Sequence, residues 1–405
     1  MNSGKPRIAF IIQRYGEELT GGSESMCRQV AERLAAHYAV DVLTSCATDH
    51  LSWKNVLSPG LQELNGVTVR RFRTEEERNL VEFHKIYDRI FLTQLSAAEE
   101  EHMVRLQGPY TPDLVHYVRD HQQDYEAFIV FTYLYYTAVQ TLPLLKSRAI
   151  FVPTVHDETS LYLHILDDLF RTTPHLLFNT EEEHFLAQRR FNLPSSVGRV
   201  AGIGVEEPQP GEPDGLWEKL RQRLQDKQVL TFVGRVENAK GCDQLVDFFS
   251  RFVEAEQRKD VILLLLGRRT LPLQPHAQIL SPGYVSDYVK YQALSVTDVG
   301  IAPSPFESLC MAALETWMHR QPMLVNGNSP VLVSQCLRSN GGLWYSNYGE
   351  FREALNMLLS DRDMRATLGR QGRLYVESNY RWDLVEQTYR DVISQIAKPR
   401  RTQLS

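Results

Sequence analysis

The sequence has few cysteines, no long apolar run and no excess of basic residues, and each absence excludes a class of protein. The longest apolar run, Val261–Leu266, can form a buried strand but is too short to cross a bilayer. No charged start followed by an apolar segment begins the chain, so no secretory signal is predicted. None of the five cysteines forms a C-x-x-C pair, which predicts no zinc site and suits a reducing cytoplasm; they are Cys27, Cys46, Cys242, Cys310 and Cys336.

The charge of the chain is weakly acidic. Lys and Arg number 44 and Asp and Glu number 50, which gives a formal net charge of −6 at pH 7. Binding to phosphate backbones needs a basic face, so nucleic acid is not expected as the main partner. Two short basic stretches, 70–73 and 398–401, are interpreted as solvated surface and leave peripheral membrane contact open. We expect a cytoplasmic protein, with association at the inner face of the membrane as an open alternative; the sequence indicates no oligomeric state.

The organisation of the chain predicts two domains of the α/β class. Short apolar runs alternate with amphipathic stretches, which is the pattern of βαβ units and a parallel sheet, and 405 residues fit two such domains. Segment 205–215 has three prolines and no periodicity, so it marks a boundary. We predict Rossmann-like, doubly wound domains over 1–205 and 206–380, followed by 381–405 with a last helix. Ligands of such folds usually bind in a cleft, which we expect between the two domains.

The predicted elements follow from the same alternation. Strands are expected at 8–12, 40–44, 67–72, 128–132, 150–155, 176–179, 229–234, 261–267, 278–280, 298–302 and 323–325. Helices are expected from Ser23 and at 241–256, 287–295, 307–319 and 330–339. From Trp344 to Ile396 the chain is predicted to be nearly continuous helix, broken near Asp361 and Asn379.

The first pattern with chemical meaning is Gly21-Gly22-Ser23-Glu24, between a predicted strand and a predicted helix. Two glycines let the backbone approach a ligand closely, and the free N–H groups of a helix start attract phosphate. A tight turn with Ser23 as the N-cap of the helix explains the pattern equally well.

The second pattern is Gly234-Arg235, followed after four residues by Lys240-Gly241, again between a strand and a helix. Arg and Lys side chains on one loop suit a diphosphate, because both make charge-assisted hydrogen bonds to phosphate oxygens. Taken alone, the pattern is also that of a solvated basic turn.

The third pattern is Gly283-Tyr284-Val285-Ser286, at the end of a strand and before a helix. Backbone groups of Tyr284 and Val285 could face the edge of a base. A common strand-turn-helix connection is the simpler interpretation of this pattern by itself.

The fourth pattern places Glu307 and Glu315 eight residues apart, at the entrance and inside of a predicted helix. Eight helical residues rise about 12 Å, so the two carboxylates are expected to bind different parts of an elongated ligand. A carboxylate accepts two hydrogen bonds side by side, which matches a vicinal diol such as ribose. The alternative is an exposed first-turn Glu with a surface Glu. The predicted helix is largely apolar, however, so a buried Glu315 would need a partner.

In this order, the four patterns resemble the retaining GT-B glycosyltransferases of the group 1 type, the relatives of glycogen synthase and bacterial mannosyltransferases. The Glu-x7-Glu pair and the upstream Gly-Arg and Lys-Gly are the most specific part of the resemblance. It implies that Arg235 and Lys240 bind the donor diphosphate. It also implies that Glu307 lies by the donor sugar and that Glu315 holds the ribose hydroxyls.

The resemblance also implies that the donor binds to the second domain and the acceptor to the first, and that the last helix, 382–396, crosses back to the first domain. Backbone N–H groups near Leu309 and Cys310 would face the sugar and the phosphates, and the loop at Gly21 and Gly22 would close over the donor. His156, in Thr154-Val155-His156-Asp157-Glu158 after a predicted strand, is the candidate for the histidine that many members place beside the transferred sugar; a structural histidine is the alternative.

Two positions differ from the usual family pattern. Leu309-Cys310 stands where Phe-Gly is common, and Arg320 stands where glycine is common. A backbone N–H remains after either change, so the differences concern the shape of the sugar pocket. Asp361-Arg362-Asp363 has the D-x-D spelling of metal-dependent transferases but is interpreted as a helix cap.

The activity that the resemblance implies is transfer of a sugar from a nucleotide sugar to a glycan, lipid-linked or other hydroxyl acceptor, with retention of configuration. No metal and no cofactor are expected, because basic side chains can stabilise the leaving diphosphate. Two alternatives stay open: a sugar-nucleotide-binding protein without transferase activity, and a phosphorylase or epimerase of similar fold.

Overall fold

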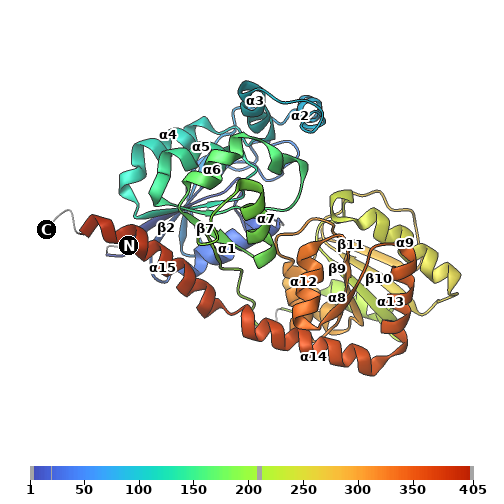
Figure 1. The fold of residues 1–405 in the computed structure, drawn as a ribbon. Helices are drawn as coiled ribbons and strands as arrows, with labels where there is room; N and C mark the ends of the chain where they lie inside the picture. Colours follow the sequence, from blue (N-terminus) through green and yellow to red (C-terminus); the bar gives the residue numbers. More distant parts are fainter. Residues whose placement is uncertain (1–3, 20, 208–211, 402–405) are drawn as a thin grey trace. The chain divides into compact units, whose positions relative to one another are not determined.

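The computed structural model describes residues 4–19, 21–207 and 212–401. The chain divides into two units, each considered by itself (Figure 1). Unit 1 runs to Ile203 and takes up the chain again from Asp383, and unit 2 is Gly204–Trp382. The boundaries expected from the sequence, after residues 205 and 380, lie close to these points.

Unit 1 is built on an eight-stranded sheet with the order β3-β4-β2-β1-β5-β6-β7-β8, in which only β3 runs antiparallel to its neighbour. Its strands are β1 (Arg7–Ile11), β2 (Ala39–Ser45), β3 (Gly60–Leu64), β4 (Val67–Phe72), β5 (Ala127–Phe131), β6 (Ala149–Val152), β7 (His175–Phe178) and β8 (Arg199–Val200). Its helices are α1 (Gly22–Leu34), α2 (Leu80–Tyr87), α3 (Ala97–Gln107), α4 (Pro112–His121), α5 (Tyr136–Leu145), α6 (Ile165–Thr172), α7 (Glu181–Phe191) and α15 (Trp382–Arg401), which begins at the last residue of unit 2.

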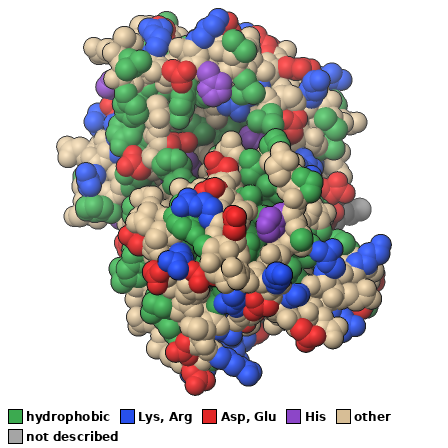
Figure 2. Space-filling view, turned by 90° about the vertical axis from the view of Figure 1, so that its right-hand side faces the viewer, with side chains coloured by type: hydrophobic (Ala, Val, Ile, Leu, Met, Phe, Trp, Pro, Cys, Tyr) green, Lys and Arg blue, Asp and Glu red, His purple; other side chains and the backbone are tan. Residues whose placement is uncertain are grey.

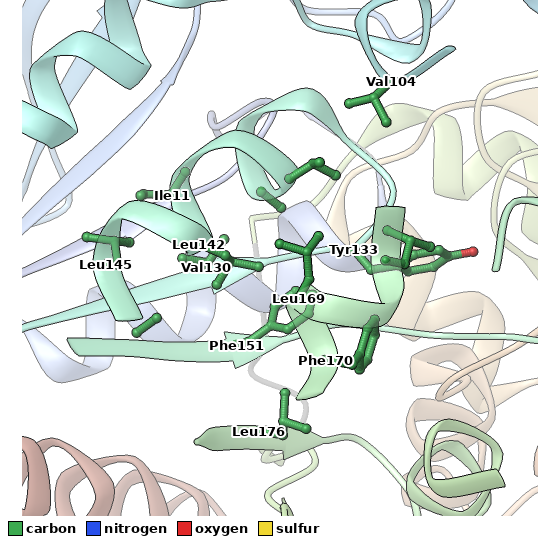
Figure 3. Packing of buried hydrophobic residues seen from close by; sticks show 14 of the residues in the cluster. Ile11, Val104, Val130, Tyr133, Leu142, Leu145, Phe151, Leu169, Phe170 and Leu176 are labelled. Atoms are coloured by element: carbon green, nitrogen blue, oxygen red, sulfur yellow. The ribbon is translucent and has the colours of Figure 1, made fainter. Parts of the chain in front are cut away.

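Helices cover both faces of this sheet. In Figure 1, α4, α5 and α6 lie on one side of it, and α1 and α15 lie on the other. Successive residues of a strand point to opposite faces, and strands β1, β5 and β6 are buried along almost their whole length, as a doubly covered sheet requires. Figure 3 shows Val130 and Phe151 of the sheet packed against Leu142 and Leu169 of the covering helices.

Unit 2 is built on a six-stranded parallel sheet with the order β11-β10-β9-β12-β13-β14. Its strands are β9 (Gln228–Val233), β10 (Val261–Leu266), β11 (Ile279–Gly283), β12 (Val299–Ala302), β13 (Met323–Asn326) and β14 (Gly342–Tyr345). Its helices are α8 (Gly215–Leu224), α9 (Cys242–Ala255), α10 (Asp287–Ser295), α11 (Met311–Met318), α12 (Pro330–Ser339), α13 (Tyr348–Ser360) and α14 (Arg362–Asn379).

The core of unit 2 lies on both faces of its sheet. Leu263 and Leu265 of β10 pack into the cluster that includes α9 and α13, whereas Ile262 and Leu264 face the cluster that includes α8 and α10. The run 261–266 is therefore apolar throughout because both of its sides are buried. The predicted α/β class with two Rossmann-like sheets is confirmed.

Some predicted elements begin or end at the wrong residue, and some strands of the structure were not predicted. The helix expected over 307–319 begins only at Met311, and the continuous helix expected from Trp344 is preceded by strand β14, which includes that residue. Edge strand β3 is exposed along most of its length and shows no apolar alternation that a sequence pattern could reveal. Asp361 is the N-cap of α14, since its Oδ1 accepts a hydrogen bond from the Met364 N–H at 2.8 Å, which confirms the cap interpretation of the D-x-D spelling.

Acidic and basic side chains are interspersed on the surface. On the face drawn in Figure 2, the Lys and Arg side chains of the described residues do not form a continuous patch. Across the described part of the chain, no helix combines the length and the apolar character needed to cross a membrane. No group of three or more His, Cys, Asp or Glu side chains with the arrangement of a metal site occurs within the same described ranges.

Candidate active site

The predicted site residues of unit 2 follow the carboxyl ends of three of its strands. Arg235 comes after β9, Tyr284 after β11, and Glu307 after β12. Because these strands are parallel, their carboxyl ends share one edge of the sheet, the edge where open α/β sheets bind ligands. Backbone hydrogen bonds also join the loops that follow β9, β10 and β11. The Gly267 N–H donates to the Gly283 carbonyl at 2.9 Å, and the Val236 N–H donates to the Arg268 carbonyl at 2.9 Å.

The loop from Gly234 to Gly241 is shaped by its last glycine. Gly241 has a φ of 70° and is the N-cap of α9, following the short 3-10 turn Asn238–Lys240. A Cβ atom at Gly241 would overlap the carbonyl oxygen of Pro303. Glycine is therefore required twice, for the left-handed conformation and for the close approach of this loop to the segment that leads to Glu307.

Lys240 and Glu307 form an ion pair across these two loops. Lys240 Nζ lies 2.7 Å from Glu307 Oε1, and the two side chains are 28% and 12% exposed. Arg235 has its own acidic neighbour, because its Nη1 lies 3.1 Å from Glu237 Oε1. Both cations of this loop are thus partly exposed and paired with a carboxylate, and their contact with a diphosphate stays a prediction.

Glu307 does not lie in a helix, which corrects the expected geometry of the acidic pair. The backbone becomes helical only after Cys310, the N-cap of α11, so Glu307 and Leu309 lie in the preceding loop. The 12 Å rise inferred for eight helical residues therefore does not apply to Glu307 and Glu315.

The start of α11 has the properties of an anion site. The first N–H groups of a helix lack partners within the helix and point along its axis, so they favour a negative group. Cys310 carries no negative charge that would oppose such a group, because burial raises the pKa of its thiol to about 12. Both Cys310 and Leu309 are buried, and contact of their backbone N–H groups with the sugar and phosphates stays a prediction.

Glu315 has a partner that the sequence did not reveal. Lys290 Nζ of α10 lies 2.8 Å from Glu315 Oε1, and both side chains are mostly buried, at 16% and 19% exposed. Burial alone would lower the pKa of Lys290, but the carboxylate of Glu315 outweighs it and raises the pKa. A partner was expected for a buried Glu315, but it comes from another helix, and no spacing within 303–315 could identify it.

Tyr284 and Val285 connect β11 to α10. Tyr284 is 58% exposed, whereas Val285 is half-buried against the cluster beside α8. Ser286 caps α10, since its Oγ accepts a hydrogen bond from Val289 N–H at 3.3 Å. The connection thus has a structural role, and the exposed ring of Tyr284 is free of the core. Contact with a base stays a prediction.

In unit 1, the two glycines of the first pattern have different surroundings. Gly21 is the N-cap of α1, and a Cβ atom there would overlap Glu24 Oε2. Glu24 is buried and accepts hydrogen bonds from Arg14 Nε at 3.0 Å, Gln13 Nε2 at 3.0 Å and Ser23 Oγ at 3.0 Å. Ser23 is therefore not the cap, and Gly21 is required by this buried network.

Gly22 is not confined in this way. A Cβ atom at Gly22 would meet no atom within 4 Å. Packing within the described residues therefore does not explain why glycine stands at this position.

His156 lies in the loop after β6, and a buried carboxylate anchors that loop. Glu183 Oε1 accepts the Val155 N–H at 2.8 Å, and its Oε2 accepts the Asn179 N–H at 2.6 Å. His156 Nδ1 lies 3.5 Å from Glu158 Oε1, which also accepts the Tyr133 hydroxyl at 2.5 Å. Sequence reasoning missed Glu183 because its side chain acts outside its own helix, where it accepts hydrogen bonds from Val155 in the loop after β6 and from Asn179 just after β7.

Comparisons with known proteins agree with this arrangement. Residues 217–375 match the family model of the glycosyl transferases group 1. The D-inositol 3-phosphate glycosyltransferase of Kribbella flavida is 28% identical over 236 residues, which are 53% of this chain and 54% of that protein. The matched region thus spans about half the length of this curated relative.

Solved structures resemble the chain over nearly its whole length. The sucrose-phosphate synthase of Thermosynechococcus elongatus has a TM-score of 0.69 at 18% identity and covers 97% of this chain and 99% of its own. The HepE protein of Anabaena in complex with UDP-glucose has a TM-score of 0.67 at 15% identity, with 96% and 99% covered. At these identities the likeness shows the fold. The resemblance drawn from the sequence is therefore confirmed: the chain has the GT-B fold, and its residues 217–375 match the group 1 glycosyl transferases.

Proposed function

We propose that this protein is a glycosyltransferase that moves a sugar from a nucleoside-diphosphate sugar to a hydroxyl acceptor. The observation that carries the proposal is the carboxyl edge of the unit 2 sheet, where Arg235, the Lys240–Glu307 pair and the start of α11 follow neighbouring strands. Cations and free N–H groups at one edge suit a diphosphate. The group 1 match of residues 217–375 supports the same assignment.

The chemistry follows from where charge develops. When the bond between the anomeric carbon and the diphosphate oxygen breaks, negative charge accumulates on the departing diphosphate. We propose that Arg235, Lys240 and the N–H groups at the start of α11 stabilise that charge. We further propose retention of configuration, with Glu307 and His156 addressing the transferred sugar and Glu315 addressing the ribose.

The relatives suggest which substrates to try first. HepE of Anabaena was solved with UDP-glucose, and the Kribbella flavida protein is named for a D-inositol 3-phosphate acceptor. A UDP-sugar is therefore the first donor to test. Glycan, lipid-linked and sugar-phosphate hydroxyls are the acceptor classes to compare.

Thermal-shift screening tests the proposal. UDP, GDP and ADP and their common sugar conjugates are each added to the purified protein, because a ligand of the folded state raises the melting temperature by mass action. We expect one base series to raise it. If no nucleoside diphosphate or nucleotide sugar does so, the proposal is wrong, and binding without any turnover would identify a non-catalytic sugar-nucleotide-binding protein.

We propose that transfer needs no metal ion, because basic side chains supply the charge for the diphosphate. Sugar transfer, or donor hydrolysis in the absence of acceptor, is expected to proceed at an unchanged rate in excess EDTA. The rate is measured by release of nucleoside diphosphate. Loss of activity on chelation and its recovery on adding Mg²⁺ or Mn²⁺ would contradict this part of the proposal.

Gly22→Ala is expected to lower the transfer rate by about 10- to 100-fold, the cost of displacing a reacting group by about 1 Å. The fold should be unaffected, since the added Cβ meets nothing within 4 Å. Melting temperature and transfer rate are measured on the same preparation. Gly21→Ala is the comparison, because it disturbs the buried Glu24 network and should lower the melting temperature. An unchanged transfer rate in Gly22→Ala would leave that glycine without a role in ligand approach.

A further inference from the structure

The second ion pair of unit 2 joins α10 to α11 at the acid proposed to bind ribose. Lys290 Nζ lies 2.8 Å from Glu315 Oε1 and 3.0 Å from Asp287 Oδ1. Lys290 and Glu315 are mostly buried, whereas Asp287 is 80% exposed. A solvated carboxylate contributes little to holding an ammonium group, so Glu315 is the partner that fixes Lys290.

Neighbouring contacts hold the same region of the two helices together. His319 Nδ1 lies 2.9 Å from the backbone oxygen of Glu315, and the His319 ring stacks on Tyr291 with centroids 5.6 Å apart. Lys290 Nζ lies 4.6 Å from the centroid of the Tyr291 ring. The Glu315 carboxylate is therefore attached to a supported segment, and the orientation of its side chain depends on Lys290.

The pair leaves one carboxylate oxygen of Glu315 available for a hydrogen bond. Among the described residues, the Glu315 side chain is engaged through Oε1, which leaves Oε2 as an acceptor. The ammonium of Lys290 has three N–H donors, and it is hydrogen-bonded to the Tyr291 side chain as well as to the Glu315 and Asp287 carboxylates. The group that the pair offers to a ligand is therefore Glu315 Oε2, which suits a ribose hydroxyl that donates a hydrogen bond.

We propose that Lys290 is a positioning residue that holds the Glu315 carboxylate for the ribose of the donor, and that the pair selects ribonucleoside over 2′-deoxyribonucleoside diphosphates. The inference rests on the proposed function and adds a specificity determinant to it. Lys290 acts through Glu315 and takes no part in the chemistry at the anomeric carbon.

Calorimetry with matched ligands tests the inference. The dissociation constants of UDP, GDP and ADP are compared with those of their 2′-deoxy forms and of inorganic pyrophosphate, and the base bound most tightly by the wild type is used. The wild type is expected to bind the ribonucleoside diphosphate about tenfold more tightly than the deoxy form, the order of one hydrogen bond to a charged group. Lys290→Met should weaken the ribonucleoside diphosphate about tenfold and leave the deoxy form and pyrophosphate unchanged.

Three further variants separate the positioning of Glu315 from a general loss of charge or of stability. Lys290→Arg keeps the charge and should retain most of the ribose preference, and Asp287→Asn should match the wild type because its carboxylate is solvated. Lys290→Gln replaces the Met variant if that variant does not fold. An unchanged ribose preference in the folded Met or Gln variant would overturn the inference, as would equal weakening of all three ligands, which is the effect of a purely structural lysine. If the wild type binds no nucleoside diphosphate at all, the proposed function itself fails.

Discussion

Lys240→Ala is expected to weaken the binding of a nucleoside diphosphate by about 10- to 150-fold, which corresponds to the roughly 1.5–3 kcal/mol of a hydrogen bond to a charged group. Lys240 lies at the carboxyl edge of the unit 2 sheet and is only 28% exposed, so its contact with a phosphate would be poorly screened by water. Calorimetric titration with the nucleoside diphosphate measures the effect.

The matched control is Lys259→Ala. Lys259 is an exposed lysine just before β10, at the opposite edge of the same sheet, and its removal should leave the dissociation constant unchanged. Lys240→Ala also removes the partner of Glu307, so its melting temperature is measured alongside. Equal dissociation constants for the folded Lys240→Ala variant and the wild type would show that Lys240 does not bind the diphosphate.

Glu307→Gln is expected to lower kcat by about 100-fold, the order found when one transition-state contact is removed. The dissociation constant of free nucleoside diphosphate should not increase, because Gln at 307 leaves Lys240 without a competing carboxylate. Contacts made only in the transition state affect kcat, whereas contacts made equally in the ground state affect KM. Steady-state kinetics of donor hydrolysis and calorimetry on the same variant separate the two.

Glu315→Gln is the complementary variant. If Glu315 holds ribose, it should weaken free nucleoside diphosphate about tenfold, the order of one hydrogen bond to a charged group. Glu307 pairs with Lys240 and Glu315 pairs with Lys290. These separate ion pairs support separate roles for the two acids. The helical separation first expected between them no longer does, because Glu307 lies outside α11. Equal weakening of the nucleoside diphosphate by both substitutions, with kcat unaffected, would contradict the assignment.

The fold could be predicted wherever burial left a pattern in the sequence. Val261–Leu266 is apolar throughout because both faces of β10 are covered, and the bounds predicted for α10 and α12 coincide with Asp287–Ser295 and Pro330–Ser339. Edge strands left weaker patterns: β3 is largely exposed, and β14 has an exposed tryptophan in a run of four residues. The start of α11 was misplaced because Leu309 and Cys310 are apolar and buried although they precede the helix, so the apolar pattern does not mark its first residue.

The candidate site could be predicted residue by residue but not contact by contact. Local spacing drew attention to Lys240, Glu307 and Glu315, yet their partners come from other elements: Glu307 for Lys240, and Lys290 for Glu315. Glu183 was missed for the same reason, since its contact with Val155, in the loop after β6, exists only in the folded chain. Long-range pairs of this kind follow from topology, which a single sequence does not display.

Donor hydrolysis by the wild type tests the central claim most directly. Radiolabelled UDP-, GDP- and ADP-sugars are incubated with the protein without acceptor, and free sugar and nucleoside diphosphate are quantified over time. The account predicts slow release of both products from at least one donor series, reduced about 100-fold in Glu307→Gln. Absence of hydrolysis with every donor, together with absence of nucleoside-diphosphate binding, would contradict it, as would an equal hydrolysis rate in the folded Glu307→Gln variant.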